Sequence, residues 1–165
     1  MRKLHVVGRK NSGKTTLIVE LIRELTSRGC RVGTIKHTHH HHEFDVPGKD
    51  SFRHREAGAA IVGLVGPSMS AAYWDRDESA ETDQQWERLF LDCDLVLVEG
   101  NQQSLAMKIE VWRAVTGQPP LALENETIQA VVSDDSIERP GLQIWPRTDV
   151  VALADRVLAM LGCEK

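Results

Sequence analysis

One segment constrains the fold of this chain more than any other. Residues 8–15, with the sequence GRKNSGKT, match the pattern GxxxxGK[ST] at every fixed position. The segment follows the apolar run 4–7, which predicts a strand, and it opens the stretch 14–28, whose apolar residues recur at helical spacing. A second strand is predicted over 31–35. Strand, glycine-rich turn, helix and strand in this order predict a parallel sheet with a right-handed crossover.

Each residue type in this segment suits the phosphates of a nucleotide. Glycines permit positive φ, and successive N–H groups at a helix start point toward phosphate oxygens. We expect Lys14 to reach the β- and γ-phosphates as a catalytic point charge and Thr15 to bind Mg²⁺. An ordinary turn that contains glycines is the alternative. The residues expected to bind the nucleotide are Gly8, Asn11, Ser12, Gly13, Lys14, Thr15 and Thr16, of which Thr16 also suits a plain helix position.

A phosphate loop of this kind also needs a carboxylate near Mg²⁺, at the carboxyl end of a neighbouring strand. The run 95–98 is apolar on both faces, as a central parallel strand requires, with Asp94 before it and Glu99 after it. A strand separates these two acids by roughly 16 Å, so only one of them can lie at the nucleotide. Because ligands bind outside the carboxyl ends of strands, Glu99 is the expected metal ligand and catalytic residue, and Asp94 a cap or a solvated side chain.

The remaining elements extend the same pattern. We expect a short helix over 51–57, strands over 108–112 and 128–133, and a last helix over 150–161. Two further strand-like runs flank Gly66-Pro67, which predicts a hairpin of residues 61–65 and 69–74. The sequence therefore predicts an α/β fold of the P-loop NTPase type: a mixed, mainly parallel sheet flanked by helices, with a β-hairpin insertion, in one domain over residues 1–165.

Histidines gather directly after the second predicted strand, at the edge of the sheet where ligands bind. His37 and Thr38 lie nearest the strand end, and His37 is expected to contact the nucleotide. The run 39–42 fits a switch-like loop, a metal site or a solvated polar loop. Asp45 and Asp50 are the acids of this loop; either suits Mg²⁺ through water, and Asp50 is counted among the expected metal ligands.

Composition excludes several other classes of protein. The chain has 165 residues, 41% of them hydrophobic, and a formal net charge of -4. There is no basic field for nucleic acid and no polybasic membrane anchor. No apolar run approaches the length of a membrane-spanning helix, and the first strand begins too early for a signal peptide. The three cysteines are far apart and form no CxxC pair, which indicates reduced thiols and a cytoplasmic location.

Taken together, these segments closely resemble the molybdopterin-guanine dinucleotide biosynthesis protein B (MobB) family. The resemblance is carried by the phosphate loop and by KHTHH at 36–40, PGKDS at 47–51, VEG at 98–100 and KIE at 108–110. It implies a P-loop domain that forms a homodimer, binds GTP with Mg²⁺ and hydrolyses it slowly. It also implies a role beside the guanylyltransferase that joins GMP to molybdopterin, with molybdopterin itself as a possible ligand.

The chain departs from the family pattern in places. Family members usually have an aromatic residue and a lysine after Val-Glu-Gly, where this chain has Asn101 and Gln102. Met107 stands where a proline is expected.

The Asn-Lys-x-Asp guanine signature of small GTPases is absent from the sequence. Asp134, at the end of the strand predicted over 128–133, is expected to accept hydrogen bonds from guanine N1 and N2, with no role at the base as the alternative.

Three other functions fit parts of the sequence. A nickel-delivery GTPase shares the phosphate loop and often has histidine runs, although the cysteines here lie far from the histidines. A small-molecule kinase needs a lid with arginines, for which Arg53, Arg55 and Arg76 are the candidates. An adaptor that binds GTP only for its own stability would dock its partner without hydrolysis.

Overall fold

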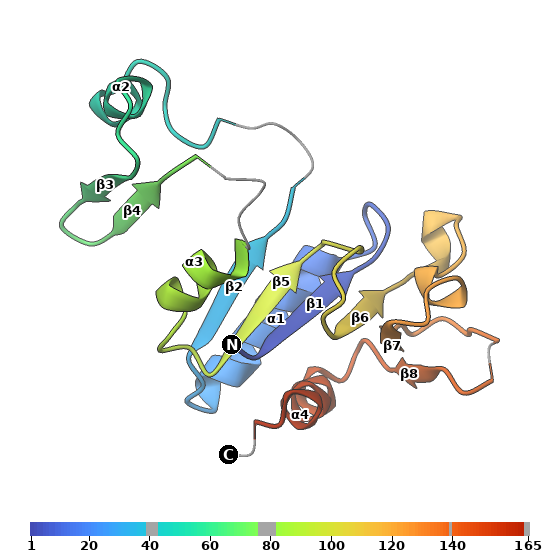
Figure 1. The fold of residues 1–165 in the computed structure, drawn as a ribbon. Coiled ribbons are helices and arrows are strands. Elements are labelled where there is room, and N and C mark those ends of the chain that lie inside the picture. Colours follow the sequence, from blue (N-terminus) through green and yellow to red (C-terminus); the bar gives the residue numbers. More distant parts are fainter. Residues whose placement is uncertain (39–42, 76–81, 139, 164–165) are drawn as a thin grey trace. The chain divides into compact units, whose positions relative to one another are not determined.

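The structure, a computed structural model, describes residues 1–38, 43–75, 82–138 and 140–163 (Figure 1). The chain forms two compact units: Met1–Thr38 with Glu87–Lys165 is unit 1, and His39–Trp86 is unit 2. The prediction of one domain over residues 1–165 stays a prediction.

A six-stranded sheet is the centre of unit 1. Its strand order is β2-β5-β1-β6-β7-β8, and every neighbouring pair is parallel. The first strand along the chain, β1, therefore lies inside the sheet between β5 and β6 (Figure 1). The strands are β1 (Lys3–Val7), β2 (Val32–Lys36), β5 (Leu95–Glu99), β6 (Lys108–Val111), β7 (Ile128–Val132) and β8 (Gln143–Trp145).

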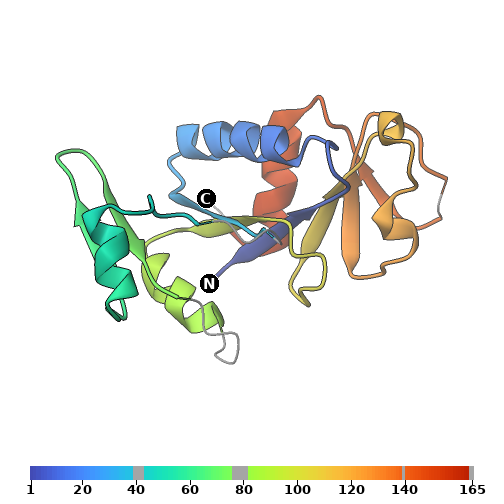
Figure 2. The ribbon, with the colours of Figure 1, turned by 90° about the horizontal axis from the view of Figure 1, so that it is seen from above.

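Two helices cover one face of this sheet. Helices α1 (Lys14–Ser27) and α4 (Val150–Leu161) lie on the same side of it (Figure 2). In the central strands β1, β5 and β6, every second residue joins the apolar core under these helices, as the alternation of side chains along a strand requires. Fully buried leucines such as Leu4, Leu21 and Leu153 each contribute about 1.5–3 kcal/mol to folding.

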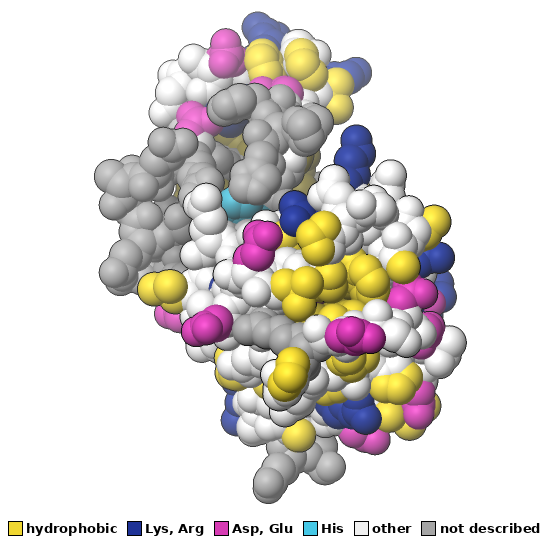
Figure 3. All heavy atoms as spheres, turned by 90° about the vertical axis from the view of Figure 1, so that its right-hand side faces the viewer, with side chains coloured by type: hydrophobic (Ala, Val, Ile, Leu, Met, Phe, Trp, Pro, Cys, Tyr) yellow, Lys and Arg dark blue, Asp and Glu magenta, His cyan; other side chains and the backbone are white. Residues whose placement is uncertain are grey.

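The opposite face of the sheet is covered by short segments. Its apolar cluster joins Val7 and Val131 to Trp112 and Ala122, next to the 3-10 helices η1 (Ala114–Thr116) and η2 (Leu121–Leu123). Polar residues are also buried on this face: His5, Lys108 and Glu110 alternate with core residues that face α1 and α4. Hydrophobic side chains gather on the molecular surface on the side where η1, η2 and β8 lie (Figure 3). Val115 of η1 is 79% exposed.

Unit 2 contains helix α2 (Asp50–Glu56) and an antiparallel hairpin of β3 (Val62–Val65) and β4 (Ser70–Tyr73). Helix α3 (Thr82–Leu89) begins in this unit and continues into unit 1. Only Val62 of the hairpin is buried. The unit therefore has little apolar core among its described residues.

Polar contacts stabilise the segment around α2. The Ser51 hydroxyl donates to a buried carboxylate oxygen of Asp45 at 2.8 Å. Arg55 forms ion pairs with Glu43 at 2.6 Å and Asp75 at 3.0 Å. These contacts hold the loop before α2 and the strand end after β4 against the helix.

The fold class predicted from the sequence is confirmed. The strands and helices predicted with bounds all begin and end within one residue of the observed bounds. Among the described strands the predicted hairpin is the antiparallel pair, and the main sheet is parallel throughout. The sequence analysis missed β8 and both 3-10 helices, and the histidine run 39–42 and Arg76 lie outside the described residues. No helix in the described ranges has the length and apolar character needed to cross a membrane.

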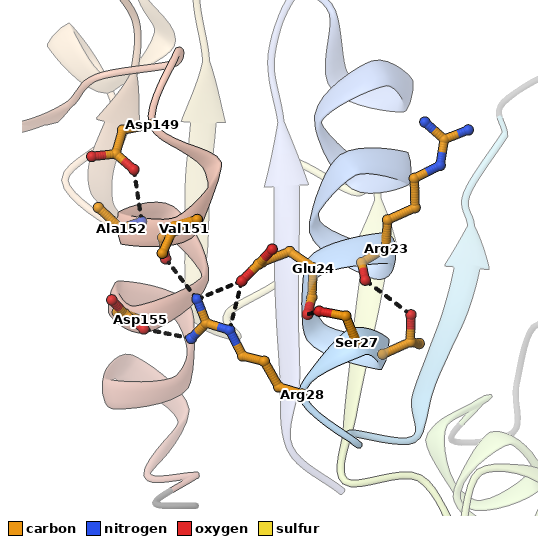
Figure 4. Close-up of polar contacts among 9 residues, drawn as sticks. Arg23, Glu24, Ser27, Arg28, Asp149, Val151, Ala152 and Asp155 are labelled. Atoms are coloured by element: carbon orange, nitrogen blue, oxygen red, sulfur yellow. Dashed lines mark hydrogen bonds and ion pairs between the residues drawn. The ribbon is translucent and has the colours of Figure 1, made fainter.

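The two helices on the sheet are joined by one arginine at the end of α1. Arg28 donates from Nε to Glu24 at 2.8 Å and from its two terminal nitrogens to Asp155 and to the Val151 carbonyl of α4 (Figure 4). At the start of α4 the Asp149 side chain accepts a hydrogen bond from the Ala152 N–H at 2.9 Å. This is an N-cap, which satisfies one of the free amides of the first turn.

Replacing Asp149 with alanine tests this cap. Asp149→Ala removes the acceptor for the Ala152 N–H, so we expect the free energy of unfolding to fall by about 1 kcal/mol. Asp149→Asn keeps a cap oxygen and serves as the control, with a stability close to wild type. Urea denaturation measures both variants. Equal losses in the two would show that the charge, rather than the cap geometry, matters.

Candidate nucleotide-binding site

The glycine-rich loop connects β1 to α1 in a conformation that depends on glycine. Gly8 has φ 145° and Gly13 has φ 98°, and Asn11 also adopts a left-handed conformation, with φ 64°. A Cβ on Gly8 would lie 2.7 Å from Ser12 Oγ and would collide with the Val111 carbonyl. The loop is thus compact and packed against the end of β6, with its backbone open to close approach.

Lys14 turns back over the loop that precedes it. Its ammonium donates to the carbonyls of Gly8 at 3.0 Å and Arg9 at 2.7 Å. Burial lowers the pKa of Lys14, and the nearby Glu99 carboxylate opposes this by raising it. A phosphate anion at this point would offer the ammonium a charged acceptor in place of two carbonyls, and hydrogen bonds to ionised groups are the stronger ones.

Ser12 adds an unsatisfied polar group to the loop. The residue is buried, at 1% exposure, and its Oγ has no hydrogen-bond partner among the described residues. Buried hydroxyls are ordinarily paired, so this one points to a ligand. Together with the N–H groups that open α1, it suits the oxygens of a bound phosphate.

Thr15 and Glu99 meet at the carboxyl edge of the sheet. The Thr15 hydroxyl lies 3.0 Å and 2.9 Å from the two carboxylate oxygens of Glu99. Lys36 at the end of β2 lies 3.3 Å from the same carboxylate. The parallel register creates this cluster, since Glu99 pairs with Val6 on one side and with Lys36 on the other. A hydroxyl and a carboxylate side by side are oxygen ligands of the kind that Mg²⁺ prefers, so these residues fit the ion.

Asp94 lies at the other end of β5, as the sequence analysis expected. One of its carboxylate oxygens accepts a hydrogen bond from the Arg31 N–H at 2.7 Å, and its own N–H donates to the Arg31 carbonyl. Asp94 thus fixes the start of β2. Within the described residues, no group of three or more His, Cys, Asp or Glu side chains is arranged to hold a metal.

The other expected site residues fall in different places. His37 follows β2 beside the Glu99 strand end, and its N–H donates to the Glu99 carbonyl at 2.9 Å. Asp134 follows β7 at the same edge and is exposed; one oxygen accepts from the N–H groups of Arg147 and Thr148. Asp50 begins α2 in unit 2, so its metal role stays a prediction. Thr16 is an exposed residue of α1.

Glu110, which the sequence analysis named only as part of the motif at 108–110 and gave no role, lies in β6 beside Val7 at the entrance to the loop. Glu110 is completely buried, and its two oxygens accept the N–H groups of Leu121 and Ala122, each at 2.8 Å. Burial raises its pKa, while these two bonds and the charge of Arg9 lower it. An acid inside the strand-like run 108–112 was the available signal, but strands with charged residues usually have an exposed face.

The parallel sheet, the glycine loop before α1 and the glutamate at the end of β5 define a fold of the P-loop NTPase class. The model of the family described as molybdopterin guanine dinucleotide synthesis protein B (MobB) matches residues 3–134. The chain therefore belongs to the MobB family, as the resemblance in its motifs predicted.

Known relatives agree with this assignment. The molybdopterin-guanine dinucleotide biosynthesis adapter protein of Escherichia coli is 36% identical over 150 residues, covering 89% of this chain and 86% of its own. The adapter protein of Haemophilus influenzae is 38% identical over 138 residues, covering 82% and 76%. A crystal structure of molybdopterin-guanine biosynthesis protein B superimposes with a TM-score of 0.75 at 28% identity, covering 97% and 99%. Bacillus subtilis MobB gives a TM-score of 0.73 at 27% identity, covering 99% and 100%.

The buried Glu110 should make the stability of the protein depend on pH. Its raised pKa means that the native state holds the proton more tightly than the unfolded chain, where the ordinary value is 4.5. Its contribution to the free energy of unfolding is therefore full below that value and is lost as the pH rises through the native-state pKa. Glu110→Gln cannot ionise and lacks this dependence.

Urea denaturation of both proteins, from about pH 4.5 to pH 7, measures the difference. We expect the stability of wild type relative to Glu110→Gln to fall as the pH rises. A relative stability that rises with pH would show that the two backbone bonds and Arg9 outweigh burial.

Proposed function

We propose that this chain is a GTP-binding adapter protein that hydrolyses GTP slowly with Mg²⁺. In this proposal it assists the guanylyltransferase that joins GMP to molybdopterin. The main support for nucleotide binding is the contact between the Thr15 hydroxyl and the Glu99 carboxylate beside the glycine loop. The biosynthetic part rests on membership of the MobB family and on relatives named as adapter proteins of this pathway.

The residues of the loop would bind the triphosphate mainly through charge and position. Lys14 would exchange the Gly8 and Arg9 carbonyls for the β- and γ-phosphate oxygens, and Ser12 would gain its missing partner. Thr15 and Glu99 would hold Mg²⁺, which when bound supplies positive charge to the phosphate oxygens.

The remaining parts of the proposal concern the base and the assembly. One carboxylate oxygen of Asp134 accepts hydrogen bonds from the N–H groups of Arg147 and Thr148. The other oxygen would accept hydrogen bonds from the N1–H and N2–H groups of guanine. A homodimer is part of the proposal, and the exposed hairpin residues Val65 and Met69, at 89% and 78%, suit contact with a second copy. A cytoplasmic location stays a prediction.

Of the two candidate lid arginines that the structure describes, Arg53 and Arg55, the second is engaged within unit 2. Both terminal nitrogens of Arg55 are engaged by Glu43 and Asp75 within unit 2, so this side chain is committed to holding α2. Nickel delivery rests on histidines 39–42, which lie outside the described residues.

Lys14→Ala tests the phosphate loop. We expect GTP affinity to fall about tenfold to a hundredfold, since a hydrogen bond to a charged group contributes about 1.5–3 kcal/mol. Lys10→Ala removes an exposed lysine from the same loop and is the matched control, with affinity close to wild type. Calorimetry with GTP and with ATP, each with and without Mg²⁺, provides the measurement. Unchanged GTP affinity in Lys14→Ala would overturn the loop assignment, and equal affinity for ATP would overturn the choice of guanine.

The two acids of β5 test the metal assignment. Glu99→Gln keeps the size of the side chain but removes the charge beside Thr15, so the gain in GTP affinity on adding Mg²⁺ should fall by about tenfold or more. Asp94→Asn, at the other end of the same strand, should keep the full gain. Phosphate release should follow the same order. A defect in neither variant would overturn the assignment of Glu99 as the metal ligand.

A further inference from the structure

Two buried polar residues on the sheet face opposite α1 and α4 have no part in the proposed site. His5 of β1 is 4% exposed and Lys108 of β6 is 1% exposed. They are partners in the register of the two central strands, so their side chains share that face. Burial lowers the pKa of Lys108, which reflects the cost of removing an ammonium from water.

His5 holds the loop 100–107, which connects Glu99 to β6. Its Nδ1 lies 3.3 Å from the Gly100 carbonyl, and its Nε2 lies 3.3 Å from Ser104 Oγ. A neutral ring with the proton on Nδ1 satisfies both contacts: Nδ1–H donates to Gly100, and the serine hydroxyl donates to Nε2. Ser104 Oγ also accepts the Ala106 N–H at 3.2 Å, so the hydroxyl is engaged on both sides.

Lys108 holds the same loop from its other end. Its ammonium donates to the Ser104 carbonyl and, at 2.8 Å, to Thr127 Oγ1. The backbone N–H of His5 donates to the Met107 carbonyl at 2.9 Å. Residues of β1 and β6 therefore form hydrogen bonds with loop 100–107 at its start (Gly100), in its middle (Ser104) and at its end (Met107).

These contacts begin one residue after the expected metal ligand. Gly100 has φ 90°, and its N–H donates to the Val6 carbonyl at 3.0 Å while its carbonyl faces His5. A side chain at Gly100 would press on the His37 carbonyl, with the Cβ at 3.2 Å. The turn that directs the chain away from Glu99 is thus held at both backbone groups of Gly100, its N–H and its carbonyl.

We propose that His5 and Lys108 are positioning residues: they hold loop 100–107 in the conformation that keeps the Glu99 carboxylate on Thr15. This inference rests on the proposed binding of GTP with Mg²⁺. An apolar pair would fill the same space without the cost of burying an ammonium, and a buried polar group can serve to select one conformation. Here the conformation selected is the turn that follows Glu99.

The variants of His5 separate its two contacts. His5→Leu removes both, whereas His5→Asn keeps a donor near the position of Nδ1, within reach of the Gly100 carbonyl. We expect His5→Leu to lose about tenfold of the gain in GTP affinity that Mg²⁺ gives, and His5→Asn to recover most of it. Lys108→Met should resemble His5→Leu. Leu161→Ala in α4 is the control, because it lowers stability in a buried position remote from the loop.

A second measurement needs no nucleotide. Amide hydrogen exchange at Ser104 reports the opening of the loop, since its N–H donates to the Asn101 carbonyl at 3.2 Å. We expect about tenfold faster exchange in His5→Leu and no change in Leu161→Ala beyond its global loss of stability.

The outcomes are distinct. Faster exchange with a reduced Mg²⁺ gain supports the inference, and faster exchange with the full gain overturns it. Unchanged exchange shows that the two residues do not hold the loop and also overturns it. If wild type itself gains no affinity from Mg²⁺, the proposed function fails at the metal, and the positioning role fails with it.

Discussion

The contact between the Thr15 hydroxyl and the Glu99 carboxylate is the interaction on which the account of this protein depends. It exists because β5 lies parallel to β1 in a register that pairs Glu99 with Val6, just before the glycine loop. A shift by one residue would turn the carboxylate to the other face of the sheet. The four residues before Glu99, Leu95, Val96, Leu97 and Val98, are all buried, so β5 packs into the core on both of its faces. Packing of the core and chemistry at the sheet edge are therefore specified by the same short strand.

The sequence predicted the glycine loop, the carboxyl-end glutamate and the parallel order around them because these features are local or follow from one rule of topology. Strand β8 was not predicted because it has only three residues, of which Trp145 alone is buried. Its pairing with β7 cannot be inferred from the hydrophobic pattern of so short a segment. The burial of Glu110 was not predicted because it depends on η2, a separate segment whose backbone N–H groups donate to the Glu110 carboxylate. The place of a charged residue in a strand is decided by what covers that strand, and periodicity does not contain this information.

The covering of the second sheet face explains why polar residues are buried there. One face carries two amphipathic helices, and its core is apolar. The other is covered partly by loops, whose backbone groups need partners away from water. Lys108 supplies a donor to the Ser104 carbonyl and Glu110 supplies acceptors to the amides of η2, so each matches the backbone group above it. The strands β1 and β6 thus connect the glycine loop to two surface segments through a small set of buried hydrogen bonds.

A crystal structure of the chain with Mg²⁺ and a non-hydrolysable GTP analogue tests the central claim most directly. We expect the triphosphate to lie along residues 8–15, with Lys14 released from the Gly8 carbonyl. We expect Mg²⁺ at about 2.0–2.1 Å from Thr15 Oγ, with the Glu99 carboxylate bound to the ion directly or through one water. A triphosphate elsewhere, or an ion held by other acids with Glu99 turned away, would contradict the account.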